Sequence, residues 1–208
     1  PVYNHERTLP AVVAALLAED LPCVLVDDAS RPEAAQAIDE LAKHPDVHLV
    51  RHTYNQGKGG AVTSGLREAA RLGFTHALQV DADGQHDLSC LELFLDRACQ
   101  IPEALICGYP LYDASVPKGR LYARYLTHVW VWINTLSLSI RDSMCGFRVY
   151  PLAPTLVLLD SVELGKRMDF DTEILVRMHW REQTMVWLPT RVHYPKDGIS
   201  HFRLWLDN

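Results

Sequence analysis

The chain has 208 residues, of which 48% are hydrophobic and 22% are charged, and its formal net charge is -6 at pH 7. This length and composition fit one globular domain spanning residues 1–208 and exclude collagen-like and disordered chains. The acidic balance argues against a nucleic-acid partner, because sequence-independent binding of nucleic acid requires a basic surface.

The chain has five cysteines, which is an odd number, and no two of them form a C-x-x-C motif. This pattern argues against a disulfide framework and a thiolate zinc site, and it favours a reducing compartment. No run of about 18 apolar residues is present, so no membrane-spanning helix is expected. We therefore expect a cytoplasmic location.

Strand-like and helix-like segments alternate through the first half of the chain. Thr8 and Asp87 are predicted helix caps, and Ser30 with Glu33 forms a capping-box pattern. This alternation predicts an α/β fold in which a central, mostly parallel sheet is flanked by helices on both faces. The predicted helices cover residues 9–18, 32–43, 59–72 and 88–100, and the predicted strands cover residues 23–26, 47–51, 75–80 and 104–107.

The regular alternation of strand-like and helix-like segments ends after residue 108. A loop rich in proline and tyrosine precedes a long aromatic helix, predicted at 118–139. A short helix near 154–160, an acidic helix beginning near Asp169 and a strand near 186–194 follow. We interpret this half as the acceptor side of the same domain.

Three polar clusters follow predicted strands: Asp27-Asp28, residues 55–60 and residues 81–87. Ligands of such sheets bind at the carboxyl ends of the strands. Asp27 or Asp28 can accept a hydrogen bond from a nucleotide base or a ribose hydroxyl. The alternative is that the pair forms a turn and caps the next helix.

Asp81 and Asp83 are two residues apart at a strand end, so their carboxylates point to the same side. Mg2+ and Mn2+ prefer such oxygen ligands, and Gln85 follows within reach. The alternative is a solvated acidic turn. Lys58 lies in a glycine-rich segment before a helix, where an anion such as a diphosphate is favoured. This segment is neither a dinucleotide-binding fingerprint nor a Walker loop.

Lys118, Arg120, Arg124 and His128 form a basic series on the aromatic helix, the last three at intervals of four residues. A basic stripe beside aromatic side chains suits the phosphate or carboxylate of a lipid-like acceptor at a membrane surface. The alternative is a core helix with a solvated basic edge.

Transfer of a group to a hydroxyl requires a base for that hydroxyl and a positive clamp for the leaving group. Asp142 and Asp171 are the candidate bases. Asp171 belongs to an acidic run with Asp169 and Glu173, which can equally be a helix start that places acidic residues against the helix dipole.

Together these segments resemble glycosyltransferase family 2, whose members are inverting enzymes with the GT-A fold, a Rossmann-like α/β arrangement. Within that family the pattern is similar to the dolichol-phosphate mannose synthase-like branch. The matching segments, in chain order, are PVYN at 1–4, VDDAS at 26–30, NQGKG at 55–59, DADGQ at 81–85, CGFR at 145–148 and the acidic helix around Glu173.

The resemblance implies roles for individual residues in binding the donor. Pro1 and Tyr3 would line the nucleotide base with Asp28, and Asn4 and Ala82 belong to the same site. Asp81 and Asp83 would hold the divalent ion, Mg2+ or Mn2+, and the diphosphate of a UDP- or GDP-sugar. Gln85 would join the metal site.

For the acceptor, the resemblance places Arg120 and Arg124 on the lipid phosphate, and Arg148 is a further candidate for binding the acceptor. Residues 1–107 would form the nucleotide-sugar half and residues 108–208 the acceptor half. His5 and Asp171 depart from the pattern of this branch, and the opening strand of the family is missing before Pro1. The aromatic helix and residues 200–203 are similar to a bacterial subgroup of aryl-polyene or lipid pathways.

The expected function is the metal-dependent, inverting transfer of a sugar from a nucleotide donor to a lipid-like acceptor, such as a polyprenyl phosphate or an aryl-polyene lipid. We expect the protein to be peripheral at the inner face of the membrane. Two alternatives remain: a sugar-phosphate nucleotidyltransferase, and a non-catalytic nucleotide-binding protein of the same fold.

Overall fold

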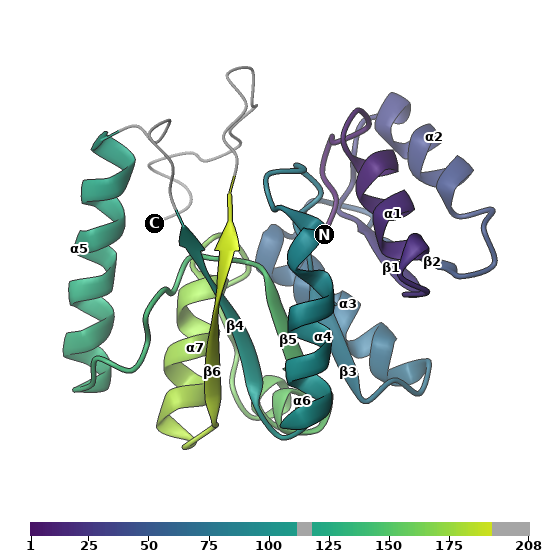
Figure 1. Ribbon diagram of the computed structural model, residues 1–208. Helices are drawn as coiled ribbons and strands as arrows, with labels where there is room; N and C mark the ends of the chain where they lie inside the picture. Colours follow the sequence, from purple (N-terminus) through teal and green to yellow (C-terminus); the bar gives the residue numbers. More distant parts are fainter. Residues whose placement is uncertain (112–117, 193–208) are drawn as a thin grey trace.

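The computed structural model describes residues 1–111 and 118–192, without the side chains of residues 118–123 (Figure 1). Helices and strands alternate along most of this length. The helices are α1 (Leu9–Ala18), α2 (Pro32–Leu41), α3 (Lys58–Arg71), a 3-10 turn η1 (Leu88–Cys90), α4 (Leu91–Gln100), α5 (Lys118–Thr135), α6 (Leu152–Ser161) and α7 (Phe170–Trp180). The strands are β1 (Cys23–Asp27), β2 (Val47–Arg51), β3 (His76–Gln79), β4 (Leu105–Leu111), β5 (Arg148–Pro151) and β6 (Met185–Arg191).

The described strands form two sheets. β1 and β2 pair in parallel, and Val2 adds a parallel bridge to Asp27. The second sheet has the order β3-β5-β4-β6, in which β4 and β6 are parallel. β5 runs antiparallel to both of its neighbours, so the second sheet is mixed. The parallel pairs are β1-β2 and β4-β6, whereas β5, which was not predicted as a strand, adds the antiparallel pairing.

Side chains of the central strands alternate between two cores. Ile106 and Val149 face a cluster that contains Phe94 of α4. Cys107 and Tyr150 face the opposite cluster, to which α3, α6 and α7 contribute. Successive strand residues point to opposite faces, so strands covered on both sides are apolar at nearly every position. This arrangement confirms the α/β class with helices on both faces of the sheet, and α5 packs outside α7 (Figure 1).

Two predicted helix caps are wrong in detail. Thr8 precedes α1, but its hydroxyl donates to the carbonyl of Ala82 at 2.6 Å and not to a helix amide. No Ser30–Glu33 capping box forms at α2. Instead, the Asn4 side chain accepts a hydrogen bond from the Arg31 amide at 2.8 Å. The predicted cap at Asp87 is confirmed, because its carboxylate accepts from the Ser89 amide at 3.0 Å.

Candidate active site

The first residues of the chain lie beside the carboxyl end of β1. The Val2 amide donates to Val26 at 2.8 Å, and its carbonyl accepts from the Asp28 amide at 2.9 Å. These contacts place Pro1 and Tyr3 next to the polar cluster that follows β1. Asn4 is turned onto α2, where its side chain binds the Arg31 amide.

Asp28 anchors the loop between β2 and α3. Its buried carboxylate accepts hydrogen bonds from the amides of Gln56 and Gly57 at 2.8 Å each. His52 Nδ1 lies 2.7 Å from the same carboxylate. The neighbouring Asp27 accepts from the Ser30 amide at 2.9 Å and from Arg51 at 2.8 Å. Both carboxylates therefore shape the protein around the site, and neither is open toward solvent.

The loop before α7 packs against the glycine-rich start of α3 and occupies the space next to it. The amides of Gly59 and Gly60 donate to the carbonyls of Arg167 and Lys166. A side chain at Gly59 would collide with Phe170. The expectation that this helix start receives an anion is therefore wrong for these two amides, because the loop before α7 already uses them. The ammonium of Lys58 is the group of this segment that reaches the polar site.

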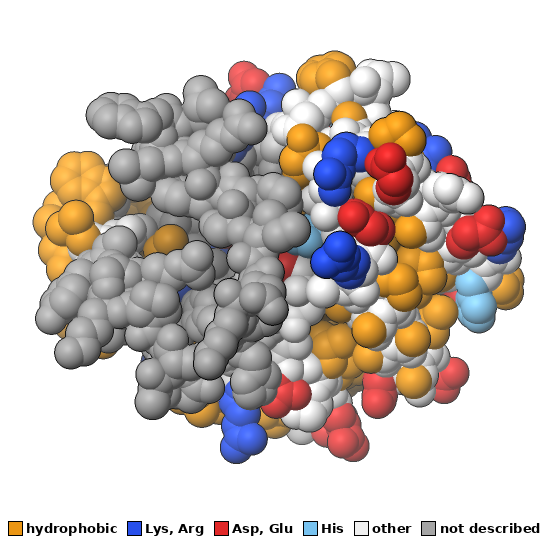
Figure 2. All heavy atoms as spheres, turned by 90° about the horizontal axis from the view of Figure 1, so that it is seen from above, with side chains coloured by type: hydrophobic (Ala, Val, Ile, Leu, Met, Phe, Trp, Pro, Cys, Tyr) orange, Lys and Arg blue, Asp and Glu red, His pale blue; other side chains and the backbone are white. Residues whose placement is uncertain are grey.

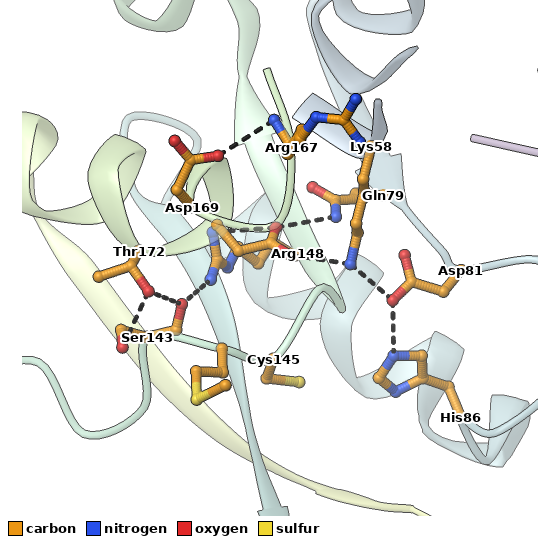
Figure 3. A network of polar contacts seen from close by, with 12 residues as sticks. Lys58, Gln79, Asp81, His86, Ser143, Cys145, Arg148, Arg167, Asp169 and Thr172 are labelled. Atoms are coloured by element: carbon orange, nitrogen blue, oxygen red, sulfur yellow. Dashed lines mark hydrogen bonds and ion pairs between the residues drawn. The ribbon is translucent and has the colours of Figure 1, made fainter. Parts of the chain in front are cut away.

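Lys58 bridges two carboxylates from different elements. Its Nζ lies 2.8 Å from Asp81 after β3 and 2.8 Å from Asp171 in the first turn of α7 (Figure 3). Burial opposes its charge, but the carboxylates of Asp171 and Asp81 more than offset this effect and raise the pKa of Lys58. The ammonium thus connects the donor-side motif to the helix expected to face the acceptor.

The two oxygens of Asp81 have different surroundings. Oδ2 faces Lys58, and His86 Nε2 lies 3.8 Å from it. Oδ1 is buried and accepts no hydrogen bond from the residues that the structure describes. Burial raises the pKa of Asp81, but Lys58 and His86 outweigh it and hold the pKa well below its ordinary value. Asp81 therefore carries a negative charge and one open oxygen.

Asp83 and Gln85 follow in a tight turn, in which the Asp83 carboxylate accepts from the Gln85 amide at 3.0 Å. Among the described residues, no group of three or more His, Cys, Asp or Glu side chains is placed to hold a metal ion. The open oxygen of Asp81 and the carboxylate of Asp83 are ligands of the kind that Mg2+ or Mn2+ accepts. They fit such an ion when further oxygen ligands come from a substrate.

A buried network supports Asp171 from the opposite side. Gln79 donates to its carboxylate at 3.2 Å, and Arg148 Nη1 lies 3.8 Å away. Arg148 is completely buried and also donates to the Ser143 carbonyl at 3.0 Å and to the Tyr150 hydroxyl at 3.3 Å. Burial raises the pKa of Tyr150 to about 12, so this phenol stays neutral. Arg148, expected on the acceptor, has its partners inside the protein.

Asp142 lies in a second cluster, with residues of α5. Arg124 donates to both of its oxygens, and His128 Nε2 lies 3.3 Å from Oδ2. The amides of Met144 and Cys145 donate to Oδ1 at 3.0 and 2.7 Å. Burial raises the pKa of Asp142, but His128 and Arg124 beside its carboxylate outweigh this effect and lower the pKa. Arg124 and Asp142 are thus brought together, whereas the side chain of Arg120 lies outside the described residues.

Sequence reasoning assigned no role to His52, Gln79 or Tyr150, and it included His86 and Gly146 only as members of the segments 81–87 and 145–148. Gln79 and Tyr150 carried a signal, because each is a polar side chain between two apolar residues. Gly146 lies in the matching segment 145–148, but no local pattern indicated its steric role. A side chain there would come within 2.9 Å of Asp81, Gln79 and Lys58, so only glycine lets this backbone approach the ion pair.

Comparison with known sequences gives a consistent result. The sequence model of the family described as "Glycosyl transferase family 2" matches residues 1–153. An undecaprenyl-phosphate mannosyltransferase of Micrococcus luteus is 27% identical over 192 residues, which cover 85% of this chain and 74% of the relative. A dolichyl-phosphate beta-glucosyltransferase of Dictyostelium discoideum is 26% identical over 199 residues, covering 84% of this chain and 59% of the relative.

Among solved structures, glucosyl-3-phosphoglycerate synthase of Mycobacterium tuberculosis in complex with Mn2+ and uridine-diphosphate-glucose has a similar fold. The TM-score is 0.65 and the identity is 16%, with coverage of 95% of this chain and 71% of that chain. At this identity the likeness establishes the GT-A fold.

Proposed function

The chain belongs to glycosyl transferase family 2, and we propose that it transfers a sugar from a nucleoside-diphosphate donor to the phosphate group of a lipid. The observation that carries the proposal is the pairing of Lys58 with Asp81 at the carboxyl end of β3. It combines an ammonium, which suits a leaving diphosphate, with a buried carboxylate that has one open oxygen.

In this proposal residues 1–107 hold the donor. Pro1 and Tyr3 flank Val2, which pairs with the end of β1, and they would contact the nucleotide base. Asp28 acts by shaping the loop that carries Lys58. Asp81, with Asp83 and Gln85, would hold Mg2+ or Mn2+. When bound, such an ion neutralises charge that develops on the leaving diphosphate. The structural neighbour with bound Mn2+ and uridine-diphosphate-glucose supports this choice of ligand class.

The acceptor class follows from the chemistry of the relatives, whose names specify undecaprenyl phosphate and dolichyl phosphate. An oxygen of the lipid phosphate attacks the anomeric carbon of the sugar and forms a new C–O bond. The bond from that carbon to the nucleoside diphosphate breaks, with inversion at the carbon. The bonding electrons leave with the diphosphate, next to Lys58.

With a phosphate acceptor, Asp142 and Asp171 do not need to act as general bases. The second pKa of a phosphate monoester is about 6, so its attacking oxygen is already anionic near pH 7 and needs no general base. This matches the contacts of both residues, because Arg124 neutralises Asp142 and Lys58 neutralises Asp171. In the proposed reaction they hold cations in place and abstract no proton.

Helix α5 supports peripheral contact with a membrane that contains the lipid. Residues 118–135 contain no aspartate or glutamate, and apolar side chains of this helix are exposed at the edge of the molecule (Figure 2). No helix within the described part of the chain meets the length and hydropathy needed to cross a bilayer. An amphipathic helix with basic and aromatic residues is suited to lie in the membrane interface.

Calorimetric titration of UDP and GDP, with and without Mn2+, tests the donor site directly. We expect at least one nucleoside diphosphate to bind about tenfold more tightly with the metal than without it. Transfer is then measured from the corresponding radiolabelled sugar nucleotides to undecaprenyl phosphate in detergent. Absence of metal-dependent binding for all nucleotides would contradict the proposal. Release of pyrophosphate from a nucleoside triphosphate and a sugar phosphate would replace it with the nucleotidyltransferase alternative.

A further inference from the structure

We propose that Lys58 is a resident counter-ion of Asp81, which keeps the affinity for a free divalent metal low and makes metal binding depend on a bound diphosphate. The inference rests on the proposed donor site and adds a specific role for one side chain in it. Its starting point is geometric. Lys58 Nζ is 2.8 Å from both Asp81 Oδ2 and Asp171 Oδ2, and only 15% of its side chain is exposed.

The ammonium is held firmly between these carboxylates. The backbone of the first turn of α3 is fixed by hydrogen bonds from Gly59 and Gly60 to the loop before α7. On another side, the backbone at Gly146 approaches so closely that a methyl group there would lie 2.9 Å from Nζ. Lys58 therefore has little freedom to leave the carboxylates in the absence of a new anionic partner.

A metal at Asp81 would meet this ammonium at short range. Oδ1 is the open oxygen, and it is bonded to the same carbon as Oδ2, which Lys58 occupies. A dication on Oδ1 would lie within a few ångströms of the ammonium. In a largely buried site, repulsion between like charges at such a distance changes binding constants by about tenfold or more. Lys58 thus disfavours the metal when the metal binds alone.

A diphosphate reverses this effect. Among the described residues, the protein places no group of three His, Cys, Asp or Glu side chains around an ion, so most ligands must come from elsewhere. Mg2+ is commonly bound by one or two carboxylates together with substrate phosphates. The phosphate oxygens bring negative charge between the metal and Lys58, and both cations then contact the same anion. Each ligand thereby strengthens binding of the other, as thermodynamic linkage requires.

The test compares Mn2+ binding, measured by electron paramagnetic resonance of the free ion, in the wild type and in Lys58→Met. We expect the variant to bind Mn2+ alone about tenfold more tightly, and the enhancement of Mn2+ affinity by UDP or GDP to shrink by a similar factor. Lys58→Arg keeps the charge and should behave like the wild type. If Lys58→Met binds Mn2+ alone with unchanged or weaker affinity, the counter-ion role is wrong.

A second comparison covers the possibility that Lys58→Met does not fold, since it leaves Asp171 buried without its cation. Asp171→Asn and the double variant Lys58→Met/Asp171→Asn differ only in the ammonium. We expect tighter binding of Mn2+ alone by the double variant, and equal affinities would overturn the inference. Failure of the proposed function has a different signature. In that case no nucleoside diphosphate binds the wild type with Mn2+, while the comparison of Mn2+ alone still reports on Lys58.

Discussion

Arg124 holds Asp142 through two parallel hydrogen bonds, each 2.6 Å long. The pair joins α5 to the segment that leads into β5, and the same carboxylate accepts the amides of Met144 and Cys145. Bidentate pairs of arginine and carboxylate are among the stronger polar interactions in proteins. Since α5 otherwise packs mainly on α7, this pair fixes the helix to the core of the molecule.

We expect Asp142→Asn to lower the free energy of unfolding by about 2–3 kcal/mol, because an amide cannot neutralise the largely buried Arg124. Urea denaturation measures the change. Asp160→Asn is the matched control, since Asp160 pairs with Arg67 on the surface and should lose less than about 1 kcal/mol. Binding of the nucleoside diphosphate should persist in Asp142→Asn. Equal stability of Asp142→Asn and the wild type would show that the pair does not anchor α5.

The same carboxylate should make stability depend on pH. The pKa of Asp142 is lower in the folded protein than in the unfolded chain, where it is about 3.9. The folded state therefore gains stability from Asp142 that is fully present above about pH 4 and is lost as the pH falls toward the folded-state pKa. We expect the difference in unfolding free energy between the wild type and Asp142→Asn to shrink steadily between about pH 4 and pH 2. A difference that is independent of pH would contradict this assignment.

The closeness of Lys58 and Asp81 could be predicted, because local patterns place both residues after strands. Asp81 follows β3 and Lys58 begins α3 after β2, and residues that follow the strands of an α/β fold gather at the carboxyl ends of those strands. The sequence could not indicate that Lys58 pairs with Asp171. That contact joins residues more than a hundred positions apart, and the acidic run around Asp171 reads equally well as an ordinary helix start.

Two errors have identifiable physical causes. The strand β5 escaped prediction because it begins with Arg148, a charged residue that the fold buries completely by giving it Ser143, Tyr150 and Asp171 as partners. The helix start after Gly57 was interpreted as an anion site because glycine permits close approach. The approaching group is the loop at Lys166 and Arg167, and no spacing rule separates that case from a ligand.

Asp83→Asn should abolish the metal-dependent part of nucleotide binding while the fold survives. Asp83 is partly exposed, and its carboxylate accepts a local turn hydrogen bond from the Gln85 amide, which an asparagine side chain can also accept. We expect the enhancement of UDP or GDP affinity by Mn2+ to fall at least about tenfold in calorimetric titrations, since one carboxylate ligand is lost. If Mn2+ enhances nucleotide affinity equally in the variant and in the wild type, Asp83 is not a ligand of the metal. Asp87→Asn, at the nearby helix cap, is the control and should keep the enhancement of nucleotide affinity by Mn2+.

Gly146→Ala should damage the donor site through sterics alone. The added methyl group would lie 2.9 Å from Asp81 Oδ2, Gln79 Nε2 and Lys58 Nζ, which is too close for any of these contacts to persist unchanged. We expect a loss of about 1–3 kcal/mol in unfolding free energy and weaker binding of the nucleoside diphosphate. Gly65→Ala is the control, because its methyl group would only touch Val26 at 3.3 Å. Equal behaviour of the two variants would show that the backbone at Gly146 does not confine the ion pair.

We expect the exposed face of α5 to contact the lipid surface. Leu126, Trp130 and Ile133 lie on one side of the helix and are 74%, 65% and 58% exposed. We expect simultaneous substitution of these three residues by serine to reduce co-sedimentation with phosphatidylglycerol-containing vesicles at least about tenfold, because burial of large apolar side chains is lost. Nucleotide binding should stay unchanged, since no contact among the described residues links these side chains to Lys58 or Asp81. Val157→Ser, at an exposed position on α6, is the control. Full retention of vesicle binding by the triple variant would place the membrane contact elsewhere on the protein.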